Sequence, residues 1–219
     1  MKKLLLILVH SVLWRTIFKL VIGLRFYNRE VLRKSKQYIL IANHNSHLDS
    51  MAIMSAIPAK NVHTVHPIAA EDFFGDGSVK EFLMVNFVNA ILIPRRRAKN
   101  PGDADPINMM SDLLKNGHSI ILYPEGTRGE PGIMQEFKKG LALVASRHPE
   151  VDVIPIFIDG LHRTMPKGFS LILPYNCKLI VGEPIAFESY EIDDILKASE
   201  NAILNLEPEK ELDPESDLS

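Results

Sequence analysis

The stretch Tyr38-Ile39-Leu40-Ile41-Ala42-Asn43-His44-Asn45-Ser46-His47-Leu48-Asp49 decides the fold of this chain. Its apolar first half predicts a buried strand over residues 37–42. Ser46 and Asp49 stand three positions apart, and a serine followed by an acid at that spacing favours the first turn of a helix. The unit is therefore a strand, a short polar loop that contains His44, and a helix.

The rest of the chain repeats this alternation of apolar strands and helices. That order predicts an α/β fold, a three-layer sandwich around a mostly parallel central sheet. The further expected strands are 62–70, 90–94, 119–123, 153–158, 171–173 and 177–181, and the expected helices are 46–57, 78–85, 107–116, 137–147 and 190–206. Ligands of such sheets bind at the carboxyl ends of strands, so polar motifs at strand ends are the first candidates for a site.

His44 and Asp49 are the first candidate pair. A histidine exchanges a proton near neutral pH, and a carboxylate at its second ring nitrogen fixes the tautomer. Five positions on a continuous helix would hold the two side chains about 140° apart. The pair therefore works only if His44 precedes the helix and Asp49 lies in its first turn. The alternative is that Asp49 only caps the helix and His44 is an ordinary polar loop residue.

A second motif, Tyr123-Pro124-Glu125-Gly126-Thr127-Arg128, follows the strand expected over 119–123. An arginine beside a glycine-containing turn suits a phosphate group, because the guanidinium donates bidentately and glycine lets the backbone approach. Lys138 and Lys139 would add positive potential. The alternative is a tight turn with a surface ion pair between Glu125 and Arg128.

A third motif, Arg95-Arg96-Arg97, follows the strand expected over 90–94. A triplet of arginines is usually a solvated run. Beside a phosphate site it would hold the headgroup of an acceptor or the phosphates of coenzyme A.

Together these motifs resemble the HxxxxD glycerolipid acyltransferase family, and most of all its bacterial 1-acyl-sn-glycerol-3-phosphate (lysophosphatidate) acyltransferases. Residues 43–49 match the NHxxxxD block in full, and 123–128 match the FPEGTR block with tyrosine in place of phenylalanine. Residues 92–95 resemble an FIxR block, with Leu92 for the aromatic and Asn89 where glycine is usual. Residues 153–156 resemble a V-x-P-V/I strand. The resemblance extends over roughly residues 35–185.

The resemblance implies transfer of a fatty acyl group from acyl-CoA or acyl carrier protein to the 2-hydroxyl of 1-acyl-glycerol-3-phosphate, which gives phosphatidic acid without a covalent acyl-enzyme. His44 would be the general base and Asp49 its orienting partner, with no metal and no cofactor besides the acyl donor. Pro155 would shape the donor side. The implied acceptor-binding residues are Arg95, Glu125, Gly126, Thr127 and Arg128. The expected partners are membrane lipid, the lysophospholipid acceptor and the donor, and not nucleic acid. The departures near Arg95 leave another lysophospholipid or alcohol acceptor open.

Residues 4–24 are strongly apolar and are interrupted by Ser11, Arg15 and Lys19, which share one helical face. A transmembrane helix fits the length, but each central cation costs about 3 kcal/mol there. A signal peptide fits the basic start, but no small-x-small cleavage site follows. The third alternative is a helix in the membrane interface, its polar face towards headgroups and Trp14 and Phe18 in the apolar part. Both membrane alternatives place the protein at the cytoplasmic face, peripheral or monotopic or with one span.

Charge is distributed unevenly along the 219 residues. Residues 1–36 carry nine basic side chains and one acid, whereas 207–219 carry six acids and one base. The basic end suits anionic lipid, and the acidic end predicts a disordered tail. The expected division is a membrane-associating segment 1–34, an acyltransferase domain 35–206 and a tail 207–219. The single cysteine, Cys177, excludes an internal disulfide.

Two other functional classes stay open. A metal-dependent hydrolase would take its ligands from His44, His47, Asp49, His63 and His66. It would leave the motif at 123–128 unexplained, and the odd spacing of His63 and His66 would point them to opposite faces of a strand. A non-catalytic lipid-binding module would need no base, and the intact His44 and Asp49 pair is evidence against it.

Overall fold

The computed structural model describes residues 2–73, 79–98, 100, 102–127, 129, 133–164 and 175–208. Its strands are β1 (Arg25–Tyr27), β2 (Tyr38–Ala42), β3 (Val65–Ala70), β4 (Ile91–Ile93), β5 (Ser119–Leu122), β6 (Asp152–Asp159) and β7 (Lys178–Val181). They form one sheet in the order β1-β7-β6-β2-β5-β3-β4. The strands from β6 to β4 run parallel, β7 is antiparallel to β6, and β1 is parallel to β7 at the edge.

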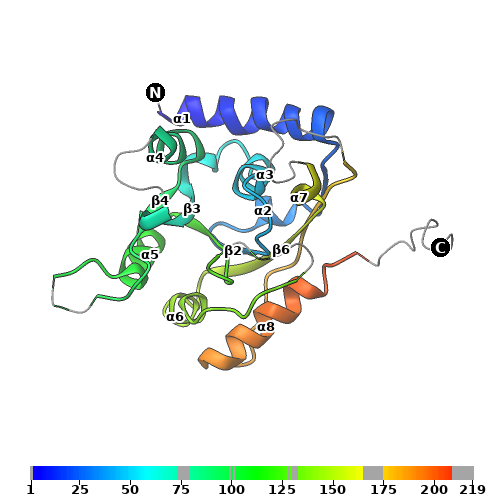
Figure 1. The fold of residues 1–219 in the computed structure, drawn as a ribbon. Helices are drawn as coiled ribbons and strands as arrows, with labels where there is room; N and C mark the ends of the chain where they lie inside the picture. The colour runs from blue at the N-terminus through cyan, green and yellow to red at the C-terminus, as the bar shows by residue number, and fades with distance from the viewer. Residues whose placement is uncertain are drawn as a thin grey trace.

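Helices cover both faces of this sheet (Figure 1). One face is covered by α3 (Asp49–Ala56), and the other by α5 (Pro106–Lys115), α6 (Gly140–Ala145) and α8 (Ile192–Leu204). The central strand β2 is buried throughout and alternates between the two cores: Leu40 belongs to the core under α3, and Ile39 and Ile41 to the opposite core. The expected α/β sandwich with a mostly parallel sheet is therefore confirmed.

Most expected elements appear within a few residues of their bounds, and the differences are local. Sequence reasoning missed the edge strand β1 and two single-turn helices, α2 (Val31–Lys34) and α7 (Leu161–Thr164). The segment expected as strand 62–70 begins as a 3₁₀ turn, η3 (Val62–Thr64), so His63 is not in a strand. The helix expected near 78–85 is α4 (Val79–Leu83) continued by η5 (Met84–Val88), after the turn η4 (Glu71–Phe73). The strand expected over 171–173 and the tail from 209 onward lie outside the described residues.

The N-terminal segment is one helix, composed of α1 (Lys2–Leu6), η1 (Ile7–Trp14) and η2 (Ile17–Ile22), the last two wound as π-helix. By length and composition, Lys2–Ile22 is apolar enough to cross a membrane. It nevertheless lies along the domain and contacts α3, η3 and η5, as the blue helix at the top of Figure 1 shows. It ends at Gly23, whose positive φ of 83° turns the chain towards β1.

The orientation expected for this helix in the interface is wrong. Arg15 points into the protein and donates from Nε to the carbonyl of Ser55 (2.8 Å) and from Nη2 to that of Ile57 (3.0 Å). Phe18 is fully buried in the core. The reason is that the carbonyl end of α3 attracts a cation, which turns Arg15 inward, whereas Lys19 stays exposed. Many of the exposed side chains of the helix are apolar, and they include Leu4, Leu8, Val12, Leu13, Leu20 and Val21.

Candidate active site

The two strongest motifs meet at one edge of the sheet. Strands β2 and β5 are neighbours with Ile41 opposite Leu122, so His44 and Glu125 each follow three residues later. The chain leaves β2 through α3 on one face and leaves β5 through α6 on the other. Connections that diverge in this way leave a crevice beyond the carboxyl ends of the strands, where α/β proteins bind ligands.

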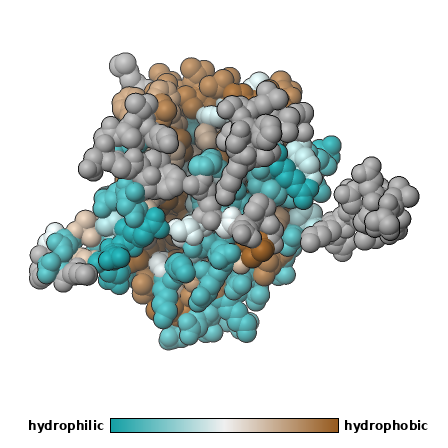
Figure 2. Space-filling model, viewed as in Figure 1, coloured by the Kyte–Doolittle hydropathy of each residue, from teal (hydrophilic) through white to brown (hydrophobic). Residues whose placement is uncertain are grey.

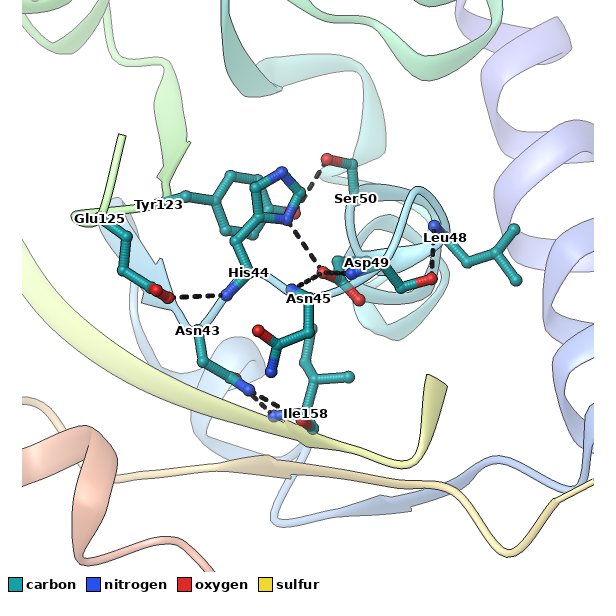
Figure 3. A network of polar contacts seen from close by, with 10 residues as sticks. Asn43, His44, Asn45, Leu48, Asp49, Ser50, Tyr123, Glu125 and Ile158 are labelled. Atoms are coloured by element: carbon teal, nitrogen blue, oxygen red, sulfur yellow. Dashed lines mark hydrogen bonds and ion pairs between the residues drawn. The ribbon is translucent and has the colours of Figure 1, made fainter. Parts of the chain in front are cut away.

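His44 and Asp49 are hydrogen bonded, with 2.9 Å between His44 Nδ1 and Asp49 Oδ2 (Figure 3). The same carboxylate oxygen accepts from the backbone N–H groups of Asn45 (2.9 Å) and Ser46 (2.8 Å). Asp49, the first residue of α3, therefore holds the loop before the helix and the His44 ring with the same oxygen atom. The side chain of Asp49 is 1% exposed and that of His44 is 20% exposed.

This contact sets the tautomer of His44. A carboxylate can only accept, so Nδ1 carries the proton and neutral His44 presents an unprotonated Nε2. Within the described part of the chain, Nε2 has no hydrogen-bond partner. An imidazole oriented by a buried carboxylate, with its other nitrogen free, is the arrangement of a general base.

Glu125 fixes the backbone of His44. Its Oε1 accepts from the His44 N–H (3.0 Å) and its Oε2 from the Gln135 N–H (3.0 Å), and the residue is 1% exposed. The carbonyl of His44 accepts from the Gly129 N–H (3.1 Å). Both backbone groups of His44 are thus held by the loop after β5. The geometry gives Glu125 a positioning role, since both its oxygens hold backbone N–H groups and the residue is buried. The alternative ion pair involves Arg128, which lies outside the described residues.

Tyr123 and Asn43 also hold the histidine, and sequence reasoning did not single them out. The Tyr123 ring stacks on the His44 ring with centroids 3.9 Å apart, and its hydroxyl bonds Ser50 Oγ at 2.8 Å. Burial, and then the charge of Asp49, raise the pKa of Tyr123 well above its usual value, so it stays neutral. Asn43 exchanges two hydrogen bonds with the backbone of Ile158 and ties the end of β2 to β6. The only sequence signal was tyrosine in a position where phenylalanine is usual.

The remaining residues of the second motif form an exposed turn. Gly126 has φ 74° and its N–H bonds the Tyr123 carbonyl (2.9 Å), while Thr127 is exposed. Lys138 runs past this turn, because a Cβ built on Gly126 would lie 3.3 Å from Lys138 Cγ. Arg128 lies outside the described residues. The turn therefore combines backbone close to the surface with at least one exposed cation.

Arg95 is not brought up against His44. It follows β4, three strands from β2, which is about 14 Å along the sheet edge. Its guanidinium donates hydrogen bonds to both carboxylate oxygens of the exposed Asp72, with 2.9 Å between Nε and Oδ2. This hydrogen bonding lowers the pKa of Asp72. Arg97 pairs with Asp105 (2.7 Å), the cap of α5. The arginine triplet thus lies on the same edge of the sheet but at its far side.

The ligand set of a metal site is not assembled in the part of the chain described. No three His, Cys, Asp or Glu side chains gather there in a way that could hold an ion. His47 is exposed, whereas His66 is buried and bonds His118. Pro155 is buried within β6, opposite Ile41, and so lies below the strand ends.

Comparisons with known proteins agree with this geometry. Residues 23–159 match the family described as "Acyltransferase". A 1-acyl-sn-glycerol-3-phosphate acyltransferase alpha of Homo sapiens is 30% identical over 165 residues, which are 74% of this chain and 54% of that protein. A chloroplastic 1-acyl-sn-glycerol-3-phosphate acyltransferase of Arabidopsis thaliana is 36% identical over 95 residues, 43% of this chain and 26% of that protein. The chain thus spans about half the length of the human relative, and less of the plant one.

A solved structure has the same fold. It is the crystal structure of the 1-acyl-sn-glycerophosphate acyltransferase PlsC from Thermotoga maritima, which superposes with a TM-score of 0.64 at 24% identity. The superposition covers 88% of this chain and 76% of that one. The α/β fold of this chain is therefore one that a solved acyltransferase also adopts.

Proposed function

The chain belongs to the acyltransferase family, and from that premise we propose that it transfers a fatty acyl group from acyl-CoA or acyl carrier protein to the 2-hydroxyl of 1-acyl-glycerol-3-phosphate. The product would be phosphatidic acid. The observation that carries the proposal is the hydrogen bond between His44 Nδ1 and Asp49, which leaves Nε2 free as a base. The names of the human and plant relatives favour this acceptor.

In the proposed mechanism, the acceptor hydroxyl donates to His44 Nε2 and its oxygen attacks the thioester carbonyl. The proton passes to Nε2, and Asp49 stabilises the imidazolium that forms. The tetrahedral intermediate collapses, the carbon–sulfur bond breaks, and the leaving thiolate takes the proton from Nε2. The thiol and the new ester are the products, His44 is neutral again, and no acyl group is attached to the protein.

The phosphate of the acceptor would bind at the exposed turn after β5. The backbone at Gly126 and Thr127 and the cation of Lys138 lie there. Arg95 is the further candidate, because its partner Asp72 is exposed and surface ion pairs of this kind exchange readily. An acidic group of the substrate would replace that carboxylate. The same chemistry on another lysophospholipid or alcohol is the alternative, since Arg95 is the residue around which the sequence departs from the family pattern.

We place the enzyme on a membrane surface, with the N-terminal helix as its contact. The exposed side of that helix carries leucine and valine side chains, and Figure 2 shows hydrophobic residues gathered along the top of the molecule, over this helix. Phe82 and Leu83, both in the neighbouring helix α4, are also exposed. Because the helix packs along the domain and is apolar on its outer side, a position in the membrane interface is favoured over a transmembrane orientation.

A thiol-release assay with acyl-CoA and a panel of acceptors tests the proposal. We expect release with lysophosphatidate, and its loss in His44→Ala. His47→Gln is the matched control, because it changes the exposed histidine three residues away and should leave turnover near that of the unmodified protein. Loss in both variants would favour the metal-ligand alternative. Release that survives in His44→Ala would contradict the assigned base. Failure with acyl-CoA and with acyl carrier protein would overturn the proposed activity.

A further inference from the structure

A basic cavity lies where the N-terminal helix meets the first strand, away from the His44 site. Its volume is about 880 Å³. Its lining includes four cations, Arg15, Lys19, Arg25 and Arg29, and among the described residues that line it none is an acid. A concave surface with one sign of charge concentrates ligands of the opposite charge.

The two inner arginines are held in place but keep free donors. Arg15 uses one N–H each from Nε and Nη2 on the carbonyls of Ser55 and Ile57. Arg29 uses Nε (3.0 Å) and Nη2 (2.9 Å) on the carbonyl of Ala56, and its guanidinium lies over the Phe26 ring at 5.2 Å. A guanidinium has five N–H donors, so each arginine has three left. A guanidinium group that is held in place and still has free N–H donors is a usual protein partner of phosphate.

Among the residues that the structure describes, no carboxylate forms an ion pair with the cations of this cavity. Burial, and then the positive charges of Arg15 and Arg33, lower the pKa of Arg29 to about 10. Arg29 remains protonated at neutral pH, but its cation is held at an energetic cost. An anion bound between these side chains would relieve both the desolvation and the mutual repulsion.

The cavity opens beside the apolar surface that we assign to the membrane. Lys19 is followed directly by Leu20 and Val21, which are 73% and 50% exposed. The exposed aromatic residues Tyr27 and Tyr175 lie close by, and tyrosine is frequent at the level of lipid headgroups. The ligand that fits a cationic cavity next to exposed leucine and valine is an anion carrying acyl chains.

We propose that this basic cavity binds the phosphate of an anionic membrane phospholipid, as a second lipid site separate from the acceptor site. The cavity and the reacting histidine lie at opposite ends of α3: Arg15 and Arg29 bind its last carbonyls, and Asp49 is its first residue. An eight-residue helix places these ends about 12 Å apart. The proposal rests on the proposed membrane association but does not depend on the acyl transfer.

Vesicle binding tests this site without any need for turnover. The double variant Lys19→Gln/Arg25→Gln removes two cavity cations whose side chains make no hydrogen bond or ion pair within the described part of the chain, so the fold should be kept. Its matched control is Lys115→Gln/Lys197→Gln, which removes the same charge from α5 and α8 on the opposite face. We expect binding to vesicles of phosphatidylcholine with phosphatidylglycerol to fall about 30-fold in the cavity variant and to be unchanged in the control. Equal losses in both, or no loss in the cavity variant, would overturn the site.

Two further arms identify the ligand chemistry. Vesicles that carry cholesteryl hemisuccinate at the same zeta potential present carboxylate groups instead of phosphate groups. A site whose geometry is specific for phosphate should bind these vesicles more weakly. Equal binding would mean diffuse attraction only. The single tryptophan, Trp14, precedes Arg15 in the N-terminal helix and serves as the fluorescent reporter. Its fluorescence should respond to soluble dihexanoyl-phosphatidylglycerol in the unmodified protein but not in the cavity variant. Saturation by inorganic phosphate at the same concentration would identify a free-anion site and overturn the lipid assignment.

Discussion

One carboxylate oxygen of Asp49 has two roles. This oxygen, Oδ2, accepts from the His44 ring and from the backbone N–H groups of Asn45 and Ser46, in the loop just before α3. Asp49→Asn separates these two roles, because an amide oxygen still accepts from backbone N–H groups but an amide cannot stabilise an imidazolium. We expect kcat to fall by about 10²- to 10⁴-fold with little change in the melting temperature.

Thiol release and thermal unfolding measured side by side check this expectation. The control is Asp193→Asn, which neutralises an exposed acid in the first turn of α8. A collapse of stability in Asp49→Asn, with activity lost only in proportion, would mean that Asp49 holds the loop before α3 and no more.

Glu125 is the residue at which the geometry departs from the role that the resemblance implies. Both its oxygens hold backbone N–H groups, so Glu125→Gln leaves one buried donor facing an amide. Such a group costs about 1–3 kcal/mol, and it would loosen the loop that places His44. We expect kcat to fall about 10- to 100-fold while KM for the acceptor changes less than about twofold.

Steady-state kinetics of this variant distinguish positioning from direct binding. Glu136→Gln, an exposed acid of the same loop, is the control and should behave like the unmodified protein. A raised KM for the acceptor at constant kcat in Glu125→Gln would restore the acceptor-binding role.

The central pair could be predicted from the sequence because its evidence is local. The capping pattern places Asp49 in a first turn and His44 just before it, and the two side chains do meet. The stack of Tyr123 on His44 and the bond between Asn43 and Ile158 could not be predicted, since they join residues 79 and 115 positions apart in the chain. Such contacts depend on strand order, which a single sequence does not specify.

At the scale of elements, the carbonyl end of α3 explains how the N-terminal helix is docked. Arg15 and Arg29 supply the cations that a helix C-terminus attracts, one from the N-terminal helix and one from the turn before α2. The stripe of Ser11, Arg15 and Lys19 was visible in the sequence, but its direction was not. A cationic stripe suits a headgroup layer and a helix terminus equally well, and only the packed structure distinguishes them.

The contact between β3 and β5 predicts a dependence of stability on pH. His66 Nδ1 lies 3.0 Å from the Asn89 carbonyl, and its Nε2 lies 2.8 Å from His118 Nδ1. Burial lowers the pKa of His66 to about 4 against a weaker opposing effect of the Asn89 carbonyl, and the nearby cations Lys2, His63 and His118 lower it further. The unfolded chain takes up this proton below about pH 6.5, whereas the folded protein resists it down to about pH 4.

The free energy of unfolding should therefore be intact above pH 6.5 and fall as the pH drops towards 4. The contribution of His66 is roughly 2 kcal/mol between pH 7 and 5. Urea unfolding at pH 7 and at pH 5 measures this contribution. In His66→Gln the free energy of unfolding should change less between the two pH values, by the contribution of His66, whatever the absolute stability of the variant. An identical slope in the variant would show that other groups cause the dependence.

Across the whole molecule, the resemblance to the acyltransferase family is confirmed by the match over residues 23–159 and by the shared fold. The alternation of strands and helices was enough for the fold class. The short edge strand β1 was not predicted. It has three residues, of which only Phe26 is partly buried, and so few residues show no hydrophobic periodicity. The apolar N-terminal helix was predicted with Arg15 on its outer side, whereas Arg15 points into the protein, because the sequence does not show that Arg15 binds the carbonyl end of α3.

The two parts of the proposed membrane surface should be separable by experiment. Leu4 and Leu8 lie one turn apart on the outer side of the N-terminal helix, 73% and 58% exposed, and neither belongs to the core. Leu4→Ser/Leu8→Ser should leave folding intact and weaken binding to neutral phosphatidylcholine vesicles about 100-fold, because each leucine that enters an apolar phase contributes about 1.5–3 kcal/mol. Tyr190→Ser/Leu204→Ser, which removes exposed apolar side chains on the opposite face, should bind as before.

The preference for phosphatidylglycerol should survive in the leucine variant, since the basic cavity is untouched. Neutral binding that persists there would mean that another surface enters the membrane and that this helix is covered in some other way.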